Sequence, residues 1–258
     1  NENGAETTVN GWLHSALCGL PVIDLACNGR AHPTSQMGSL GLHTEDDYLS
    51  IQGYAGGAPE RYIEGVARGR LDATSGVVRR ASVDAGGLVA VARNPVTIDY
   101  AVRHGAPGAI SFAIALGHAW LDGGVEGAVR HLGGRMLASG TVARYSCEQR
   151  EGLDVGLVQL DDAHKTTLHF VNEYMVMEQQ GRPVARFPDL VMTFGEDGGP
   201  LVSARVREGQ RVQVAHVPGS RLLLSRTMFM PELYRPVEKA IGQAFAPQPL
   251  AQAVPAHA

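Results

Sequence analysis

Side chains that can do chemistry are concentrated between Pro21 and His43. This stretch, PVIDLACNGRAHPTSQMGSLGLH, supplies carboxylate, thiol, amide, guanidinium, imidazole and hydroxyl groups from Asp24, Cys27, Asn28, Arg30, His32, Ser35, Gln36 and His43. Its first three residues, Pro-Val-Ile, predict a short buried strand, and Gly29 and Pro33 predict an irregular loop after it. Reactive groups in α/β proteins usually follow strand ends. We therefore expect the functional site in residues 21–43, named here the N-terminal loop.

A metal site is one chemistry that the N-terminal loop supports. Cys27 and His32 are good ligands for Zn²⁺ or another divalent metal, and Asp24 or His43 could complete an open site of three ligands. A metal held in this way lowers the pKa of its bound water to about 7. Such a water could hydrolyse a cyclic amide, imide or thioimidate.

Hydrolysis of this kind also needs a donor for the developing oxyanion and a group that moves the proton. Arg30 is the expected donor, and Glu173 or Asp189 is the expected proton carrier. We expect a small-molecule substrate to contact Asn28, Gly29, Gln36 and Asn172.

Two other interpretations of the N-terminal loop stay open. Cys27 could act as a thiolate nucleophile that His32 or His43 activates. Alternatively, the loop is structural: residues 28–30 form a tight turn, His32 caps it and Cys27 packs inside. Turn chemistry is likewise an alternative for the Asn-Glu and Pro-Asp pairs that contain Glu173 and Asp189.

The pattern of the chain changes near Gly133. Before it, helical spacing predicts helices over 7–20, 71–85, 97–104, 109–121 and 124–132, with strands over 48–54, 61–66 and 88–92. After it, alternation predicts strands over 136–145, 155–160, 166–171, 174–178, 190–194 and 211–217, then a helix over 231–244. We expect an α/β (α+β) protein with an α/β domain over 1–133, a β-rich domain over 134–246 and a disordered tail over 247–258.

Composition excludes several classes of function. The 258 residues are 44% hydrophobic and 19% charged, with a formal net charge of -4, so no basic surface for nucleic acid or an anionic membrane is expected. Apolar runs end well short of the ~20 residues that a membrane span needs. Three cysteines without a CxxC pair indicate a reducing, cytoplasmic setting. The polar start without Met indicates processing or a missing upstream segment.

Six segments together resemble a known family. They are NGRAHPTSQMGSLGL, GGLVAVARNPV, APGAISFAIALG, FVNEYMV, RFPDLVMTF and REGQRVQVAHVP. Their order is similar to that in the S-methyl thiohydantoin desulfurase family, which is often associated with hydantoinase and oxoprolinase subunits. The resemblance runs from about residue 2 to 217, and it implies an N-terminal α/β domain, a C-terminal β-rich domain and an active site between them. His32 stands where the family pattern has an aromatic residue, and the upstream part of the first domain is absent, which indicates a divergent branch.

These observations lead to two expectations about function. The first is a cytoplasmic hydrolase-like enzyme that acts on a small cyclic amide related to hydantoin or thiohydantoin. The second is a non-catalytic accessory subunit that binds a hydantoinase or oxoprolinase-type partner. A homo-oligomer is also expected, because the helix over 109–121 is rich in small residues and apolar surface would otherwise stay exposed.

Overall fold

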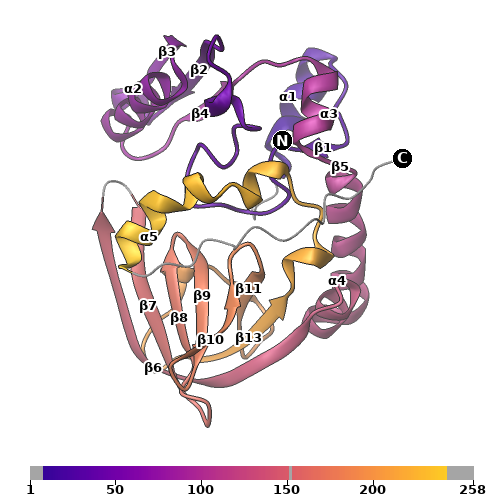
Figure 1. Ribbon diagram of the computed structural model, residues 1–258, viewed down its shortest axis with the longest axis vertical. Helices are drawn as coiled ribbons and strands as arrows, with labels where there is room; N and C mark the ends of the chain where they lie inside the picture. The colour runs from indigo at the N-terminus through magenta and orange to yellow at the C-terminus, as the bar shows by residue number, and fades with distance from the viewer. Residues whose placement is uncertain (1–7, 151–152, 243–258) are drawn as a thin grey trace.

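An antiparallel sheet of eight strands makes up most of the second half of the chain in the computed structural model, which describes residues 8–150 and 153–242 (Figure 1). The strand order is β10-β9-β8-β7-β6-β13-β11-β12. The strands are β6 (Arg135–Arg150), β7 (Leu153–Asp161), β8 (Thr167–Val171), β9 (Glu173–Gln179), β10 (Arg182–Arg186), β11 (Leu190–Gly195), β12 (Pro200–Leu201) and β13 (Arg211–Val217). The six strands predicted from alternation are confirmed, and β10 and β12 are additional.

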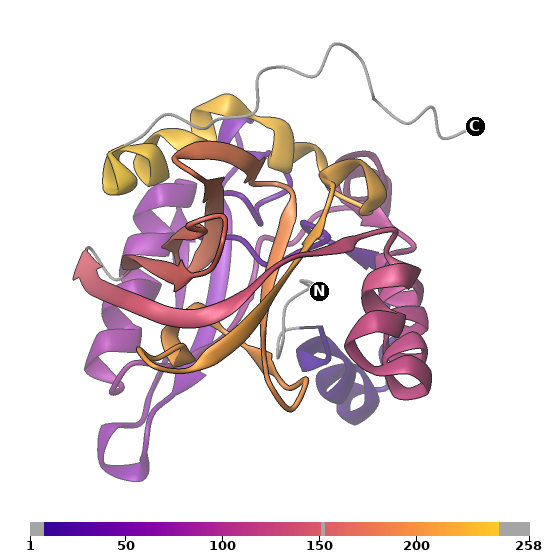
Figure 2. The same ribbon diagram turned by 90° about the horizontal axis from the view of Figure 1, so that it is seen from below.

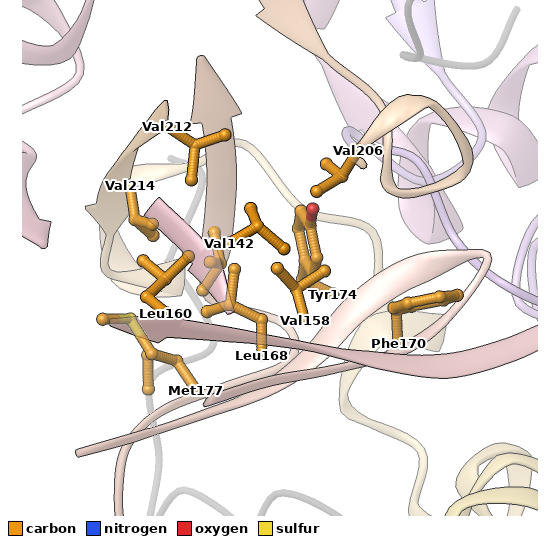
Figure 3. Close-up of a cluster of buried hydrophobic side chains, with 12 residues drawn as sticks. Val142, Val158, Leu160, Leu168, Phe170, Tyr174, Met177, Val206, Val212 and Val214 are labelled. Carbon is orange, nitrogen blue, oxygen red and sulfur yellow. The ribbon is translucent and has the colours of Figure 1, made fainter. Parts of the chain in front are cut away.

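The sheet curls until strands far apart in its order touch. β9 and β11 are separated by four strands in the sheet order, yet the Tyr174 hydroxyl lies 3.0 Å from Thr193 Oγ1. Most of the enclosed side chains come from β6 to β9 and β13, and Val206 joins them from the segment before β13 (Figure 3). Burial of each large apolar side chain contributes about 1.5–3 kcal/mol to the hydrophobic driving force. Alternation along the strands therefore determines the main core.

The first half of the chain builds a smaller layer. β2 (Ser50–Gly56) pairs with β3 (Ile63–Gly69) and β4 (Ala90–Arg93), and α2 (Leu71–Asp84) packs against this sheet of three strands. Gln52 is buried between them and donates to the Thr74 and Ser75 hydroxyls at 2.9 and 3.3 Å. The predicted hairpin and the helix after it are confirmed.

The start of the N-terminal loop differs from the prediction. After α1 (Asn10–Cys18), Val22 and Ile23 are 40% and 45% exposed and belong to no strand. The strand forms two residues later as β1 (Leu25–Ala26), which pairs with β5 (Ala106–Pro107). The predicted buried strand at residues 21–23 is wrong, because these side chains stay largely exposed, whereas Leu25 and Ala26 are buried where they pair with β5.

Two further helices belong to this half. α3 (Ile98–His104) confirms the helix predicted there, and α4 (Ala109–His131) covers the two helices predicted after it, with non-helical dihedral angles at Gly124 where they meet. The second half of α4 packs on the outer face of the large sheet, where Val129 contacts Phe194 and Ala215 (Figure 2). None of the helices within residues 8–150 and 153–242 is long and apolar enough to cross a membrane.

The end of the described chain closes one end of the curled sheet. The turns η4 (Gly219–Arg221), η5 (Arg226–Phe229) and η6 (Pro231–Tyr234) lead into α5 (Arg235–Ile241), which lies beside β7 and β8 in yellow in Figure 1. Met37 of the N-terminal loop shares a buried cluster with Phe187, Met228 and Tyr234. The loop is thus packed into the β-rich half.

The architecture confirms the predicted fold class, with mixed helices and strands first and a β-rich region after them. The domain boundary near residue 133 stays a prediction. The tail predicted over 247–258 lies outside the described residues.

Candidate functional site

Arg30 connects the N-terminal loop to the β-rich half. Its side chain is buried, with 4% of the residue exposed. Nε donates to the Ala31 carbonyl at 3.0 Å, and Nη1 donates to the carbonyls of Pro188, at 3.1 Å, and Asp189. The guanidinium carbon lies 4.3 Å from the centre of the Phe187 ring, which gives a cation–π contact. Nη2 has no hydrogen-bond partner among the described residues, so one donor of a buried cation stays available.

Burial determines the electrostatics of Arg30. It lowers the pKa of the guanidinium to about 10, although the nearby Glu173, Tyr234 and Asp189 oppose this shift. A pKa of about 10 leaves Arg30 charged at neutral pH. The site therefore contains a fixed positive charge in surroundings that screen it poorly.

The two residues before Arg30 hold its backbone in place. Asn28 is fully buried; its side chain accepts from the Gly29 N–H at 3.1 Å and donates to the Arg30 carbonyl at 2.5 Å. Gly29 has φ +85°, and a Cβ there would lie 1.7 Å from the carbonyl oxygen of Leu223. Only glycine fits this turn, because a side chain would overlap the backbone of the C-terminal segment.

Asp189 joins Arg30 to a histidine that the sequence did not single out. Its backbone carbonyl accepts from Arg30, while Oδ2 lies 3.0 Å from His216 Nε2 and Oδ1 accepts from the Gly219 N–H at 2.7 Å. Burial alone would raise the pKa of Asp189, but the hydrogen bonds from His216 and Gly219 outweigh burial and lower that pKa below its usual value. Asp189 is therefore a carboxylate at neutral pH.

This carboxylate orients His216 as a base. An ionised carboxylate only accepts hydrogen bonds, so we infer that His216 Nε2 carries a proton; in the neutral tautomer with this bond, Nδ1 bears the lone pair. His216 is 6% exposed, and its Nδ1 is buried with no hydrogen-bond partner among the described residues. Such an atom costs about 1–3 kcal/mol unless a water or a ligand satisfies it. The arrangement is that of a general base held by an acidic partner.

Strand pairing brings Asp189 and His216 together. Asp189 lies just before β11, and His216 stands near the end of β13, where its register partner on β11 is Val191. Gly219 follows in the turn after β13. We call Arg30, Asp189 and His216 the Arg-Asp-His cluster. Its members come from the N-terminal loop, the residue before β11 and the antiparallel neighbour β13.

A small cavity lies beside Glu173, one of the predicted proton carriers. Its volume is about 170 Å³, which is room for about six water molecules at roughly 30 Å³ each. Its lining is mostly apolar with a few polar groups: Asn172, Glu173, Tyr174, Leu190, Val191, Met192, Thr193, Phe194, Pro200, Leu201, Val202 and Ser203. Leu190 and Val191 directly follow Asp189, and Glu173 acts electrostatically on Arg30. None of the three cluster residues lines the cavity, so the link between them runs through Leu190 and Val191 in the chain and through the charge of Glu173.

Asn172 and Asp24 have structural partners in this arrangement. Asn172 has φ 54°, accepts from the Asp154 N–H at 2.9 Å through Oδ1, and accepts from the Ser203 hydroxyl at its carbonyl. Asp24 caps α4: Oδ1 accepts from the N–H groups of Ile110 and Ser111 at 3.0 Å, and Oδ2 accepts from the Ser111 hydroxyl at 2.6 Å. The Ser111 hydrogen bonds lower the pKa of Asp24.

The side chains predicted as metal ligands have other neighbours. His32 Nδ1 lies 2.6 Å from the Thr34 carbonyl, and His43 Nε2 lies 3.5 Å from Glu232 Oε1. Cys27 is a half-buried thiol outside any disulfide. No three or more His, Cys, Asp or Glu side chains within the described residues are grouped so that they could hold a metal ion. Cys27, His32 and His43 thus do not form the donor set in this conformation, and metal binding stays a prediction.

The structure brings together part of the predicted set. Arg30, Asp189 and Glu173 lie near one another, and Asn28 and Gly29 shape the turn under Arg30. Gln36 instead donates to the Asp72 carboxylate of α2. The sequence analysis missed His216. An imidazole near the end of the largely apolar strand QVAHV could have drawn attention to it, but the sequence alone does not show which carboxylate the strand register brings beside it.

Comparison with protein families gives one match. The family model described as S-Me-THD-like, C-terminal domain, matches residues 71–229, which is more than half of the chain. No curated protein and no solved structure matches. The matched range includes Glu173, Asp189 and His216, whereas Arg30 lies before it. The chain belongs to the S-methyl thiohydantoin desulfurase-like family.

Proposed function

We propose that the protein hydrolyses a small cyclic amide derivative of the hydantoin or thiohydantoin type, with His216 as the general base. The observation that carries this proposal is the buried His216, whose Nε2 is held by Asp189 and whose Nδ1 has no partner among the described residues. Family membership supports the substrate class.

The proposed reaction uses water as the nucleophile. His216 Nδ1 takes a proton from a water molecule as the oxygen attacks the ring carbon, and the Asp189 carboxylate stabilises the imidazolium that forms. On an S-methyl thioimidate ring, the ring nitrogen of the tetrahedral intermediate takes up the remaining hydroxyl proton, the C–S bond breaks as the carbonyl forms, and the His216 imidazolium returns its proton to the leaving thiolate. One water and the thioimidate thus give a ring carbonyl with its N–H and one methanethiol, with no change of oxidation state.

Arg30 has an electrostatic role in this proposal. Nε and one terminal nitrogen are occupied by carbonyl groups, so Nη2 is the donor left for a developing negative charge. A charge fixed in a site of low polarity stabilises such an intermediate more than the same charge in water does. In the proposal, Glu173, which lines the cavity, accepts a hydrogen bond from a ring N–H.

The test is turnover of a panel of hydantoins, thiohydantoins and their S-methyl derivatives, followed by ring absorbance and thiol release. We expect His216→Ala to lower kcat/KM at least 100-fold, as loss of a general base does. The matched control is His164→Ala, because His164 is an exposed imidazole in the turn after β7. A folded His216→Ala variant with wild-type turnover would refute the mechanism, and a wild-type protein inactive on the whole panel would refute the substrate class.

An accessory subunit is the competing function, and one observation favours it. Several large apolar side chains of α1 and α4 face solvent; Leu17 is 77% exposed and Leu121 is 82% exposed. Such surfaces often bind another protein. Stable co-purification with a hydantoinase or oxoprolinase-type partner, together with inactivity of the isolated chain, would favour this function over catalysis. A Cys27 nucleophile is the third candidate, and Cys27→Ser separates it from the mechanism based on His216.

A further inference from the structure

A second hollow, larger than the cavity beside Glu173, opens just after the N-terminal loop. Its volume is about 640 Å³, within the range of about 300–1,000 Å³ that small-molecule sites occupy. Its lining consists of Leu42, Glu45, Asp46, Asp47, Tyr48, Pro95, Val96, Thr97 and Tyr100. It shares no lining residue with the smaller cavity. We call it the tyrosine hollow.

Two tyrosine rings are fixed in the wall of this hollow. The Tyr48 hydroxyl donates to the Pro95 carbonyl at 3.2 Å, and the Tyr100 hydroxyl donates to the Leu40 carbonyl at 3.2 Å and lies 3.4 Å from a carboxylate oxygen of Glu45. One face of the Tyr100 ring stacks on His104, with centroids 4.1 Å apart. Because both hydroxyls are occupied, the rings present aromatic surface rather than hydrogen-bonding groups to a ligand.

These phenols stay neutral under physiological conditions. Burial and the neighbouring Glu45 raise the pKa of Tyr100 to about 12, and burial also raises the pKa of Tyr48. A neutral phenol ring carries partial negative charge on its faces, which attracts a cation. Two such rings form the aromatic part of a cation site.

The charge of the lining has one sign. Glu45, Asp46 and Asp47 contribute carboxylates, and no Lys, Arg or His belongs to the lining. Arg70 donates to the backbone carbonyls of Asp46 and Tyr48, which supports this acidic turn through its main chain. Arg226 acts electrostatically on Tyr100 from outside the lining, so the three carboxylates outnumber the two guanidinium groups near the hollow. The hollow therefore favours cations over neutral or anionic molecules.

The spacing of the carboxylates distinguishes between kinds of cation. Within residues 8–150 and 153–242, no three of the His, Cys, Asp and Glu side chains are close enough together to coordinate a metal ion. Negative charge on one turn of a wide hollow that also has aromatic and aliphatic walls instead fits a bulky, weakly hydrated cation. We propose that the tyrosine hollow binds an organic ammonium group, of the quaternary or tertiary class, at a site separate from the Arg-Asp-His cluster.

The test is calorimetric titration of the purified full chain with choline and with its uncharged tert-butyl analogue. We expect saturable binding of choline and at least tenfold weaker binding of the analogue. The double variant Asp46→Asn, Asp47→Asn should raise the dissociation constant for choline at least tenfold. The matched control, Asp122→Asn with Glu126→Gln on the exposed side of α4, removes the same charge elsewhere and should bind as the wild type does.

Tyr48→Leu provides an independent measurement, because it removes a ring without changing the charge. We expect a raised dissociation constant with an unchanged circular dichroism spectrum. Absence of saturable choline binding, equal affinity for the uncharged analogue, or equal weakening in the α4 control would each overturn the proposal. The test does not depend on hydrolase activity, so the two proposals can fail separately.

Discussion

Replacement of Asp189 by asparagine tests the geometry of the Arg-Asp-His cluster most directly. The two side chains have nearly the same shape, but the new amide has one acceptor where the carboxylate offers two. Oδ1 now accepts from the Gly219 N–H and Oδ2 accepts from His216 Nε2. If the new amide nitrogen faced Gly219, two hydrogen-bond donors would meet. The backbone N–H of Gly219 cannot become an acceptor, so this orientation is unfavourable.

The amide nitrogen of Asp189→Asn is therefore expected to face His216. The imidazole can relieve the conflict by moving its proton from Nε2 to Nδ1. Nδ1 then has no lone pair for a water molecule, so the proposed base is lost while the fold is kept. The equivalent Asp to Asn change in a Ser-His-Asp triad lowers kcat by about 10⁴ through the same change of tautomer. We expect a loss of about 10³–10⁴ in kcat/KM here.

The expected cost in stability is modest. A hydrogen bond to a charged group contributes about 1.5–3 kcal/mol and a neutral one about 0.5–1.5 kcal/mol, so weakening two bonds of a partly exposed carboxylate costs about 1–2 kcal/mol. This corresponds to a fall in Tm of roughly 2–8 °C for a chain of this size. Because the pKa of Asp189 is lowered in the folded state, its contribution is full above about pH 4, near the usual value of 3.8, and is lost as the pH falls through the folded pKa.

The assay measures kcat/KM on the ring compound that the wild type hydrolyses, and it measures thermal unfolding at pH 7 and below pH 4. The stability difference between wild type and Asp189→Asn should shrink at the lower pH. A folded Asp189→Asn variant with wild-type kcat/KM would refute the argument from the tautomer. A stability difference that grows as the pH falls would refute the assigned ionisation of Asp189.

The remaining predictions concern the N-terminal loop. Gly29→Ala should lower the unfolding free energy by at least about 2 kcal/mol, because the added Cβ would overlap the Leu223 carbonyl and the backbone φ is positive. The control Gly76→Ala, with open space around it in α2, should not destabilise the protein. Equal denaturation midpoints for the two variants would contradict the prediction. Asp24→Ala should cost about 0.5–2 kcal/mol in chemical denaturation through loss of the α4 cap, with turnover unchanged if the role of Asp24 is structural. Cys27→Ser should turn over at close to the wild-type rate, and a collapse of activity in the folded variant would favour the thiolate mechanism instead.

Alternation of apolar residues was enough to locate most of the β-rich half. The strand predicted over 211–217 agrees with β13 at both ends, and the strand predicted over 190–194 agrees with β11 within one residue. Because side chains alternate between the two faces of a strand, a few neighbouring residues are enough to indicate one. The same patterns did not reveal β10 and β12, which are short and lie at the edges of the sheet, where one face is not enclosed.

The candidate site was predictable only in part. The reactive residue types of the N-terminal loop drew attention to Arg30, and the Pro-Asp pair drew attention to Asp189. The partners of Asp24 lie 86 and 87 residues away at the start of α4, so its capping role could not be read from the loop. The predicted strand at residues 21–23 was wrong for a related reason, because the hydrophobicity of these residues does not show whether another element packs against them.

The sequence by itself determined the fold class and the order of most elements, because both depend on residues close together in the chain, whereas the need for glycine at position 29 follows from its contact with the distant Leu223 carbonyl. Only the tertiary structure decided that His216 pairs with Asp189 and that Arg30 reaches the carbonyl of the same residue from 159 positions away. Strand register and the curl of the sheet set these distances. Both result from packing over the whole β-rich half, so no local pattern records them.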